Sequence, residues 1–154
     1  MLAAVAIAAV VGLFSNPIFG ALSDRIGRRP VYLAGAVLSL VYSFLFFPLM
    51  GRGAAFVPIA IILGLNVTQD MMYGPQAALI AESFTGRLRY SGASLGYQLA
   101  SVFAGGPAPL IAAWLFGTYH SGMAISLYIL GCAVISLAAT AMLKDYTNKD
   151  ISLV

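Results

Sequence analysis

Five long apolar segments separated by short connections constrain this chain more than any other feature. Each is about 20 residues or longer, which is the length a helix needs to cross a bilayer. The five segments are Met1 to about Leu22, Val31–Met50, about Phe56 to Ala81, about Gly92 to Phe116, and about Met123 to Leu143. A segment in lipid must satisfy its own backbone hydrogen bonds, and the alternation typical of barrel strands is absent. The sequence therefore predicts an all-α, polytopic bundle over residues 1–143, followed by a cytoplasmic tail over residues 144–154.

The composition excludes a soluble domain. Hydrophobic residues make up 61% of the chain and charged residues only 8%, whereas soluble domains carry about 25% charged residues. The few basic residues are spread over the connections and form no continuous patch, so nucleic acid is not an expected partner. We expect the lipid bilayer as partner and the plasma membrane, in a bacterium the inner membrane, as location.

The distribution of Lys and Arg predicts the orientation. Seven of the eight lie after the first segment, after the third segment or in the C-terminal tail, and only Arg52 lies in a connection on the other side. Basic residues are retained on the cytoplasmic side of membrane proteins. This bias predicts a cytoplasmic C-terminus and an N-terminus outside.

The run Gly20 to Pro30, GALSDRIGRRP, concentrates charge between the first two segments. Its glycines allow a sharp turn and a close approach of helices, and its arginines hold the run in water as a loop. We expect Asp24 to offset part of this charge and to accept hydrogen bonds where a helix begins, while Pro30 suits the first turn of the next helix.

The spacing GxxxDRxGRR in this run resembles the cytoplasmic signature of the major facilitator superfamily of secondary transporters. The matching residues are Gly20, Asp24, Arg25, Gly27, Arg28 and Arg29. An ordinary basic loop on the cytoplasmic side is the alternative interpretation.

The third segment places an acid near the middle of the bilayer. Asp70 lies twelve residues from both Pro58 and Glu82, and a carboxylate at that depth is costly unless it is paired, hydrated or protonated. Helical spacing puts it on a broad polar face with Asn66, Gln69, Tyr73 and Gln76. This face predicts a water-filled substrate cavity with Asp70 as a proton or substrate contact. The alternative is an acid satisfied by a cation on a helix outside this chain.

Other polar residues and helix breakers extend this prediction to neighbouring segments. The fourth segment adds Tyr97, Gln98 and Ser101, and the first adds Asn16, which either borders the cavity or marks a local kink. We expect helix interruptions at Gly74, Pro75, Gly105, Gly106, Pro107 and Pro109. Interrupted helices near the membrane centre are typical of transport sites, although glycine and proline are also common in membrane helices in general.

A second charged stretch, ESFTGRLR, follows the third segment. Glu82, Arg87 and Arg89 in this stretch are expected to pair with the signature run and to latch the cytoplasmic side in one state. The alternative is that these charges only hold the connection in water.

The third and fourth segments resemble one particular family within this superfamily. MYGPQAALIAESF and RYSGASLGYQLASVFAGGPAPLIAAWL resemble the C-terminal half of the metabolite:proton symporter family within the superfamily. The resemblance implies a twelve-helix parent fold in which these segments are the eighth to twelfth helices. It identifies the chain as a fragment whose N-terminal half and seventh helix lie elsewhere. The second charged stretch matches a family motif, except that Thr85 stands where a proline is usual.

The resemblance also implies a function. The family imports organic acids and zwitterions such as proline and betaine by alternating access, with the proton as coupling ion and no other cofactor. A non-transporting remnant, or a partner that assembles with a separate half, is the alternative. We expect neither an enzyme, since clustered acids or histidines are lacking, nor a metal site, since His120 is the only histidine.

Overall fold

The computed structural model describes residues 2–53, 55–85 and 87–143, and it is helical almost throughout these ranges. The elements are α1 (Leu2–Ile26), α2 (Arg28–Met50), α3 (Phe56–Ile62), the π-helix η1 (Leu63–Gln69), α4 (Asp70–Glu82), α5 (Arg89–Ala100), the π-helix η2 (Ser101–Gly105), α6 (Pro107–Tyr119) and α7 (Gly122–Met142). Over the described residues, five rods are long and apolar enough to cross a membrane, with α3–η1–α4 and α5–η2–α6 each counting as one. The all-α prediction is confirmed, while the predicted tail, residues 144–154, lies outside the described residues.

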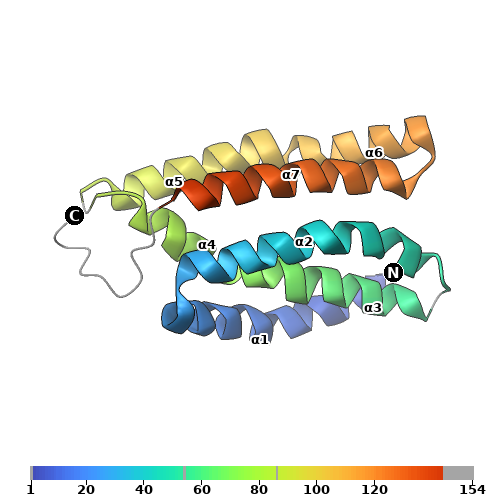
Figure 1. Cartoon of the computed structure of the whole chain (residues 1–154), viewed down its shortest axis with the longest axis horizontal. Helices are drawn as coiled ribbons and strands as arrows, with labels where there is room; N and C mark the ends of the chain where they lie inside the picture. The colour runs from blue at the N-terminus through green and yellow to red at the C-terminus, as the bar shows by residue number, and fades with distance from the viewer. Residues whose placement is uncertain (1, 54, 86, 144–154) are drawn as a thin grey trace.

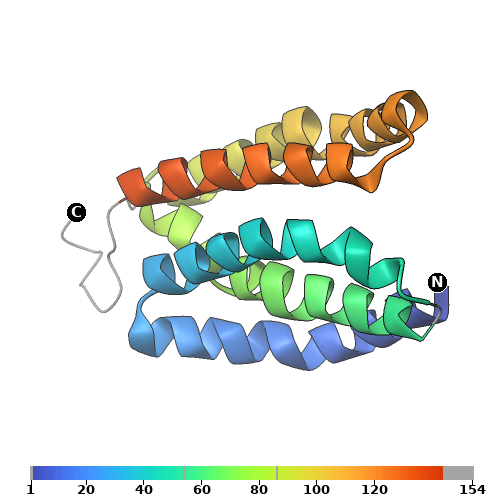
Figure 2. The same cartoon turned by 45° about the vertical axis from the view of Figure 1, so that its right-hand side comes forward.

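The five rods run in alternating directions, as Figures 1 and 2 show. α1, α2 and the α3–α4 rod pack together, and α7 runs beside both α2 and the α5–α6 rod. The α1–α2 turn, the α4–α5 connection and the end of α7 therefore share one end of the bundle (Figure 1). Arg29 connects α2 with α7 at this end, because its Nη2 donates to the carbonyl oxygen of Ala141 at 2.5 Å.

α2 is more central than its sequence indicates. The scattered Ser and Tyr of the second and fifth segments predict peripheral helices, yet α2 packs against α1, α4 and α7. Ser126 on α7 is buried and donates from Oγ to the carbonyl oxygen of Ser43 on α2 at 2.6 Å. By contrast, no described residue of α5, η2 or α6 is buried, so most of that rod is uncovered.

The signature run is not the extended loop that the sequence predicts. α1 continues through Asp24 to Ile26, α2 begins at Arg28, and Gly27 alone lies outside both helices. Gly27 has φ 118°, a left-handed value that only glycine adopts at little cost. Asp24 is also in a different role: it lies in the last turn of α1 and accepts from Arg28 of α2, instead of accepting from backbone groups at the start of a helix.

The helix is not interrupted at Gly74 and Pro75, because both residues lie inside the continuous helix α4; a kink there stays a prediction. The irregular turn of this rod is η1, which ends five residues before Gly74. Side chains satisfy backbone carbonyl groups around this turn: Tyr42 Oη donates to Ala60 at 2.7 Å, and Thr68 Oγ1 donates to Gly64 at 2.5 Å. Hydrogen bonds of this kind support a local change in the helical ladder.

The predicted break in the fourth segment is confirmed. Gly105 ends the π-helix η2, Gly106 separates it from α6, and Pro107 is the first residue of α6. Proline suits this position because the first residues of a helix have no intrahelical partner for a backbone N–H. Pro109 lies in the same first turn and is tolerated for the same reason.

Candidate functional site

A buried carboxylate lies where α1 meets the α3–α4 rod. Asp70 is the first residue of α4 and is 8% exposed. Its Oδ2 accepts hydrogen bonds from Ser15 Oγ of α1 and from Asn66 Nδ2 of η1, the latter at 2.9 Å. Hydrogen bonds to an ionised acceptor are about twice as strong as neutral ones, so these two donors offset part of the cost of burying the charge.

Asn66 links this carboxylate to the backbone of α1. Besides Asp70, its Nδ2 donates to the carbonyl oxygen of Ala8 at 2.9 Å, whereas its Oδ1 is buried without a hydrogen-bond partner. Gly12 makes the approach possible, because a Cβ there would lie 3.3 Å from Asn66 Nδ2. The contact between the two elements is thus polar and close.

A cavity of about 280 Å³ adjoins the carboxylate. Its polar walls come from Asn16, Asn66, Gln69 and Asp70, and the rest of its lining is apolar. Asn16 Oδ1 is buried without a hydrogen-bond partner, and Asp70 is the one ionisable group among the described residues that line the cavity. A space of this size with several polar walls can hold water, and water can carry a proton to the carboxylate.

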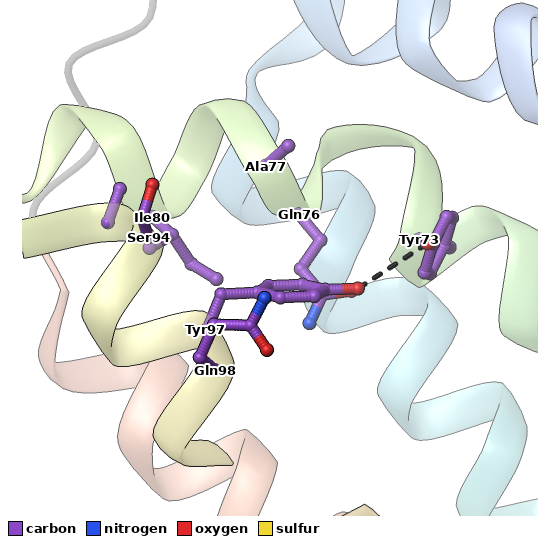
Figure 3. Close-up of a pocket in the computed structure, with 8 residues that line it drawn as sticks. Tyr73, Gln76, Ala77, Ile80, Ser94, Tyr97 and Gln98 are labelled. Atoms are coloured by element: carbon purple, nitrogen blue, oxygen red, sulfur yellow. Dashed lines mark hydrogen bonds between the residues drawn. The ribbon is translucent and has the colours of Figure 1, made fainter. Parts of the chain in front are cut away.

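A second cavity, of about 440 Å³, lies between α4 and α5 (Figure 3). The side chains of Tyr73 and Gln76 reach it from α4, and those of Ser94, Tyr97 and Gln98 from α5. The hydroxyl groups of Tyr97 and Tyr73 are 3.4 Å apart. None of the described residues lining this cavity is charged, so its walls offer neutral hydrogen-bonding groups beside apolar surface.

The structure divides the predicted polar face into these two places. Asn66, Gln69 and Asp70 lie beside Asn16 of α1, while Tyr73, Gln76, Tyr97 and Gln98 gather between α4 and α5. Residues three apart on a helix point about 60° away from each other, and α4 has α1 and α5 as separate neighbours. Ser101 lines neither cavity: its Oγ donates to the carbonyl oxygen of Tyr97 in its own helix at 3.0 Å.

The two charged stretches meet at one end of the bundle. Arg28 forms an ion pair with Glu82, whose side chain is 4% exposed, and a second one with the exposed Asp24 at 3.0 Å. Arg25 and Arg87 are exposed, and Arg89 is partly buried. The expected pairing between the stretches is therefore present, while the latch role remains a prediction.

The sequence alone did not indicate two residues that contribute to the site. Ser15 donates to Asp70, and the backbone of Gly74 lies against Gly20 and Asn16. A pattern could have indicated Ser15, because it follows Gly12 by three residues on the helix face that contacts Asn66. No group of three metal-binding side chains gathers anywhere in the described ranges.

Helices of membrane-crossing length in alternating directions, with a buried carboxylate and polar cavities between them, are the features of a polytopic membrane protein. Residues 2–149 match the family described as sugar (and other) transporter. The chain belongs to this family, which lies within the major facilitator superfamily.

Named relatives are bacterial transporters. The chain is 37% identical over 134 residues to the shikimate transporter of Escherichia coli, covering 84% of this chain and 30% of that protein. It is 34% identical over 137 residues to the inner membrane metabolite transport protein YhjE of the same species, covering 88% and 31%. To the citrate-proton symporter of Klebsiella pneumoniae it is 28% identical over 146 residues, covering 94% and 32%.

The chain thus spans about 30% of the length of the relatives it matches. No solved structure matches it.

Proposed function

We propose that this chain forms part of the C-terminal half of a proton-coupled symporter for a small organic acid or zwitterionic metabolite. The observation that carries the proposal is Asp70, a carboxylate buried within a membrane-length rod beside a cavity with polar walls. An ionisable residue at such a place is a functional site by default, because its burial is costly and gives no packing advantage.

In this proposal the two cavities have separate tasks. The cavity at α1 admits a proton to Asp70, and the neutral cavity of Tyr73, Gln76, Tyr97 and Gln98 contributes hydrogen bonds to the substrate. Separate cavities suit symport, because one transport cycle binds a proton and a substrate at the same time and releases both on the same side of the membrane. Relatives described as a shikimate transporter and a citrate-proton symporter support a carboxylate-bearing substrate.

The proposal extends to orientation and partner. The end that holds Arg28, Arg29 and Glu82 is cytoplasmic, since it carries most of the basic residues, and the N-terminus lies outside. An N-terminal half completes the cavity. The exposed polar side chains of α5, such as Ser94 and Gln98, favour this arrangement, because polar groups within a membrane helix are covered by other helices or by water.

Uptake at two external pH values tests the proposal. Cells expressing the full gene that encodes this chain are given labelled shikimate, citrate, proline or betaine, and initial rates are compared at acidic and neutral pH. We expect at least one substrate to be taken up faster at acidic pH, and Asp70→Asn to remove that acceleration. Thr68→Val, which removes a buried hydroxyl group that bonds within its own rod, is the matched control and keeps it.

Two results would contradict the proposal. Uptake of none of these solutes by a well-expressed protein would count against symport of this substrate class. An unchanged pH profile in Asp70→Asn at normal expression would remove Asp70 from proton coupling.

A further inference from the structure

We propose that Asn66 transmits the protonation state of Asp70 to α1, acting as a positioning residue that holds α1 only while the carboxylate is ionised. This inference rests on the proposed function, because it requires Asp70 to exchange a proton during transport. It concerns a residue that does not itself titrate.

The argument begins with one nitrogen atom that serves two acceptors. Asn66 Nδ2 donates to Asp70 Oδ2 and to the carbonyl oxygen of Ala8, each at 2.9 Å. The same nitrogen also lies 3.4 Å from Ser15 Oγ. An amide nitrogen carries two hydrogens, and the two shorter bonds, to Asp70 and Ala8, are the ones they serve best. Since both partners are acceptors, the amide must present its nitrogen to them as long as Asp70 is ionised.

Protonation of Asp70 changes this requirement. One proton taken from water in the adjoining cavity turns the carboxylate into a carboxylic acid, which has one O–H to donate and no charge. The bonds from Asn66 and Ser15 then lose the strength that the charge contributes. Asn66 Oδ1, buried and without a partner, is an available acceptor four residues from Asp70.

The amide can present Oδ1 to the new O–H only by rotating about its own axis. Because Ala8 and Asp70 share one side of the amide, the rotation also turns Oδ1 toward the carbonyl oxygen of Ala8. Two acceptors then face each other, which replaces the hydrogen bond between Asn66 and Ala8 by repulsion. We infer that α1 separates from η1 around Ala8 when Asp70 is protonated.

Among the residues that the structure describes, no other ionisable group is placed to produce the same effect. η1 and α3 contain no ionisable side chain, and α1 faces Asp70 with Gly12, Ser15 and Asn16. The ionisable residues on the helices packed against this region are Asp24 and Arg25 of α1, Arg28, Arg29, Tyr32 and Tyr42 of α2, and Tyr73 and Glu82 of α4. Tyr42 is bonded to Ala60 and Glu82 to Arg28, and Glu82 lies about 18 Å along the helix from Asp70.

The experiment measures the position of α1 directly. Spin labels are attached at Ile7→Cys on α1 and Val41→Cys on α2, both exposed positions, in a Cys132→Ser background of the full protein in lipid nanodiscs. Their separation is measured by pulsed electron resonance at acidic and neutral pH. We expect a pH-dependent shift in the labelled protein that is lost in Asp70→Asn and in Asn66→Leu.

Thr68→Val is the matched control for the loss of a buried polar group. Thr68 is buried on the same π-helix, but its hydroxyl bonds to Gly64 in its own rod and not to α1. This variant should keep the shift. Its loss in Thr68→Val would mean that any damage to η1 abolishes the movement, which contradicts a specific role of Asn66.

The outcome separates this inference from the proposed function. A separation that is independent of pH in the labelled protein overturns the inference even if Asn66→Leu fails to fold, and it leaves pH-dependent uptake through Asp70 intact. A shift that persists in Asn66→Leu overturns the inference, because the movement of α1 then does not depend on the amide. Absence of uptake, by contrast, rejects symport without affecting the distance measurement.

Discussion

Gly74 of α4 lies against Gly20 of α1 so closely that a Cβ added to Gly74 would stand 2.9 Å from the backbone nitrogen of Gly20 and 3.0 Å from the carbonyl oxygen of Asn16. The relationship is not symmetric, since a Cβ added to Gly20 would meet its nearest atom, the carbonyl oxygen of Gly74, at 3.9 Å. Small residues allow such close packing of membrane helices. This contact sets the distance between α1 and α4 beside the candidate site.

Gly74→Ala should therefore destabilise the bundle, while Gly20→Ala should be tolerated. The added methyl group meets backbone atoms, which cannot rotate away, and overpacking of this kind costs about 1–3 kcal/mol. Thermal unfolding in detergent, followed by circular dichroism, measures the difference. Equal stability of the two variants would show that the helices shift apart without cost.

Gly27→Ala should also lower stability. Gly27 is the single residue between α1 and α2, and its φ of 118° is unfavourable for a residue with a Cβ, at a cost of about 1–3 kcal/mol. Gly51→Ala is the control, because Gly51 follows the other end of α2 with an ordinary φ of −71°. If Gly27→Ala and Gly51→Ala unfold at the same temperature, the turn between α1 and α2 adopts another conformation in Gly27→Ala.

Glu82→Gln should lower the stability of the protein more than Asp24→Asn. Both acids pair with Arg28, but Glu82 has a side chain 4% exposed and that of Asp24 is 62% exposed. Removing one partner of a buried pair costs about 3–5 kcal/mol, whereas an exposed pair contributes about 0–1 kcal/mol. Protein abundance in the membrane and thermal unfolding both report this order.

The same pair tests the latch at the cytoplasmic end. If the pairing holds one state of the transport cycle, exchanging the charges in the double variant Arg28→Glu with Glu82→Arg should restore uptake that each single reversal loses. Single reversals that transport normally would contradict the latch.

Gln76→Ala and Gln98→Ala should weaken substrate binding without changing the pH profile of uptake. Both residues line the cavity between α4 and α5 and neither touches Asp70. Loss of one hydrogen bond to the substrate corresponds to about 1 kcal/mol, or a several-fold rise in KM for uptake. Ala93→Ser at the edge of the same cavity is the control. A changed pH profile would show that the two cavities act as one.

Much of the fold could be predicted because it follows from the bilayer. Apolar length and basic connections indicate five helices long enough to cross a membrane, and the position of Asp70 along its segment indicates a buried acid. The break before Pro107 could be predicted as well, since proline acts on its own helix. The place of the irregular turn in the third rod could not be predicted: the regular helix α4 accommodates Gly74 and Pro75, and Tyr42 from a neighbouring helix bonds the backbone beside the irregular turn upstream.

The candidate site also combines contacts that the sequence predicts with contacts that only the tertiary structure determines. Helical spacing alone brings Asn66 and Asp70 together, because residues four apart share a face whatever surrounds them. Only the packing of α1 decides that Asn66 bonds Ala8, that Ser15 bonds Asp70, and that Tyr73 faces a different cavity. Spacing within one segment is a property of the local backbone, whereas the partner across an interface depends on which small residues let two helices approach.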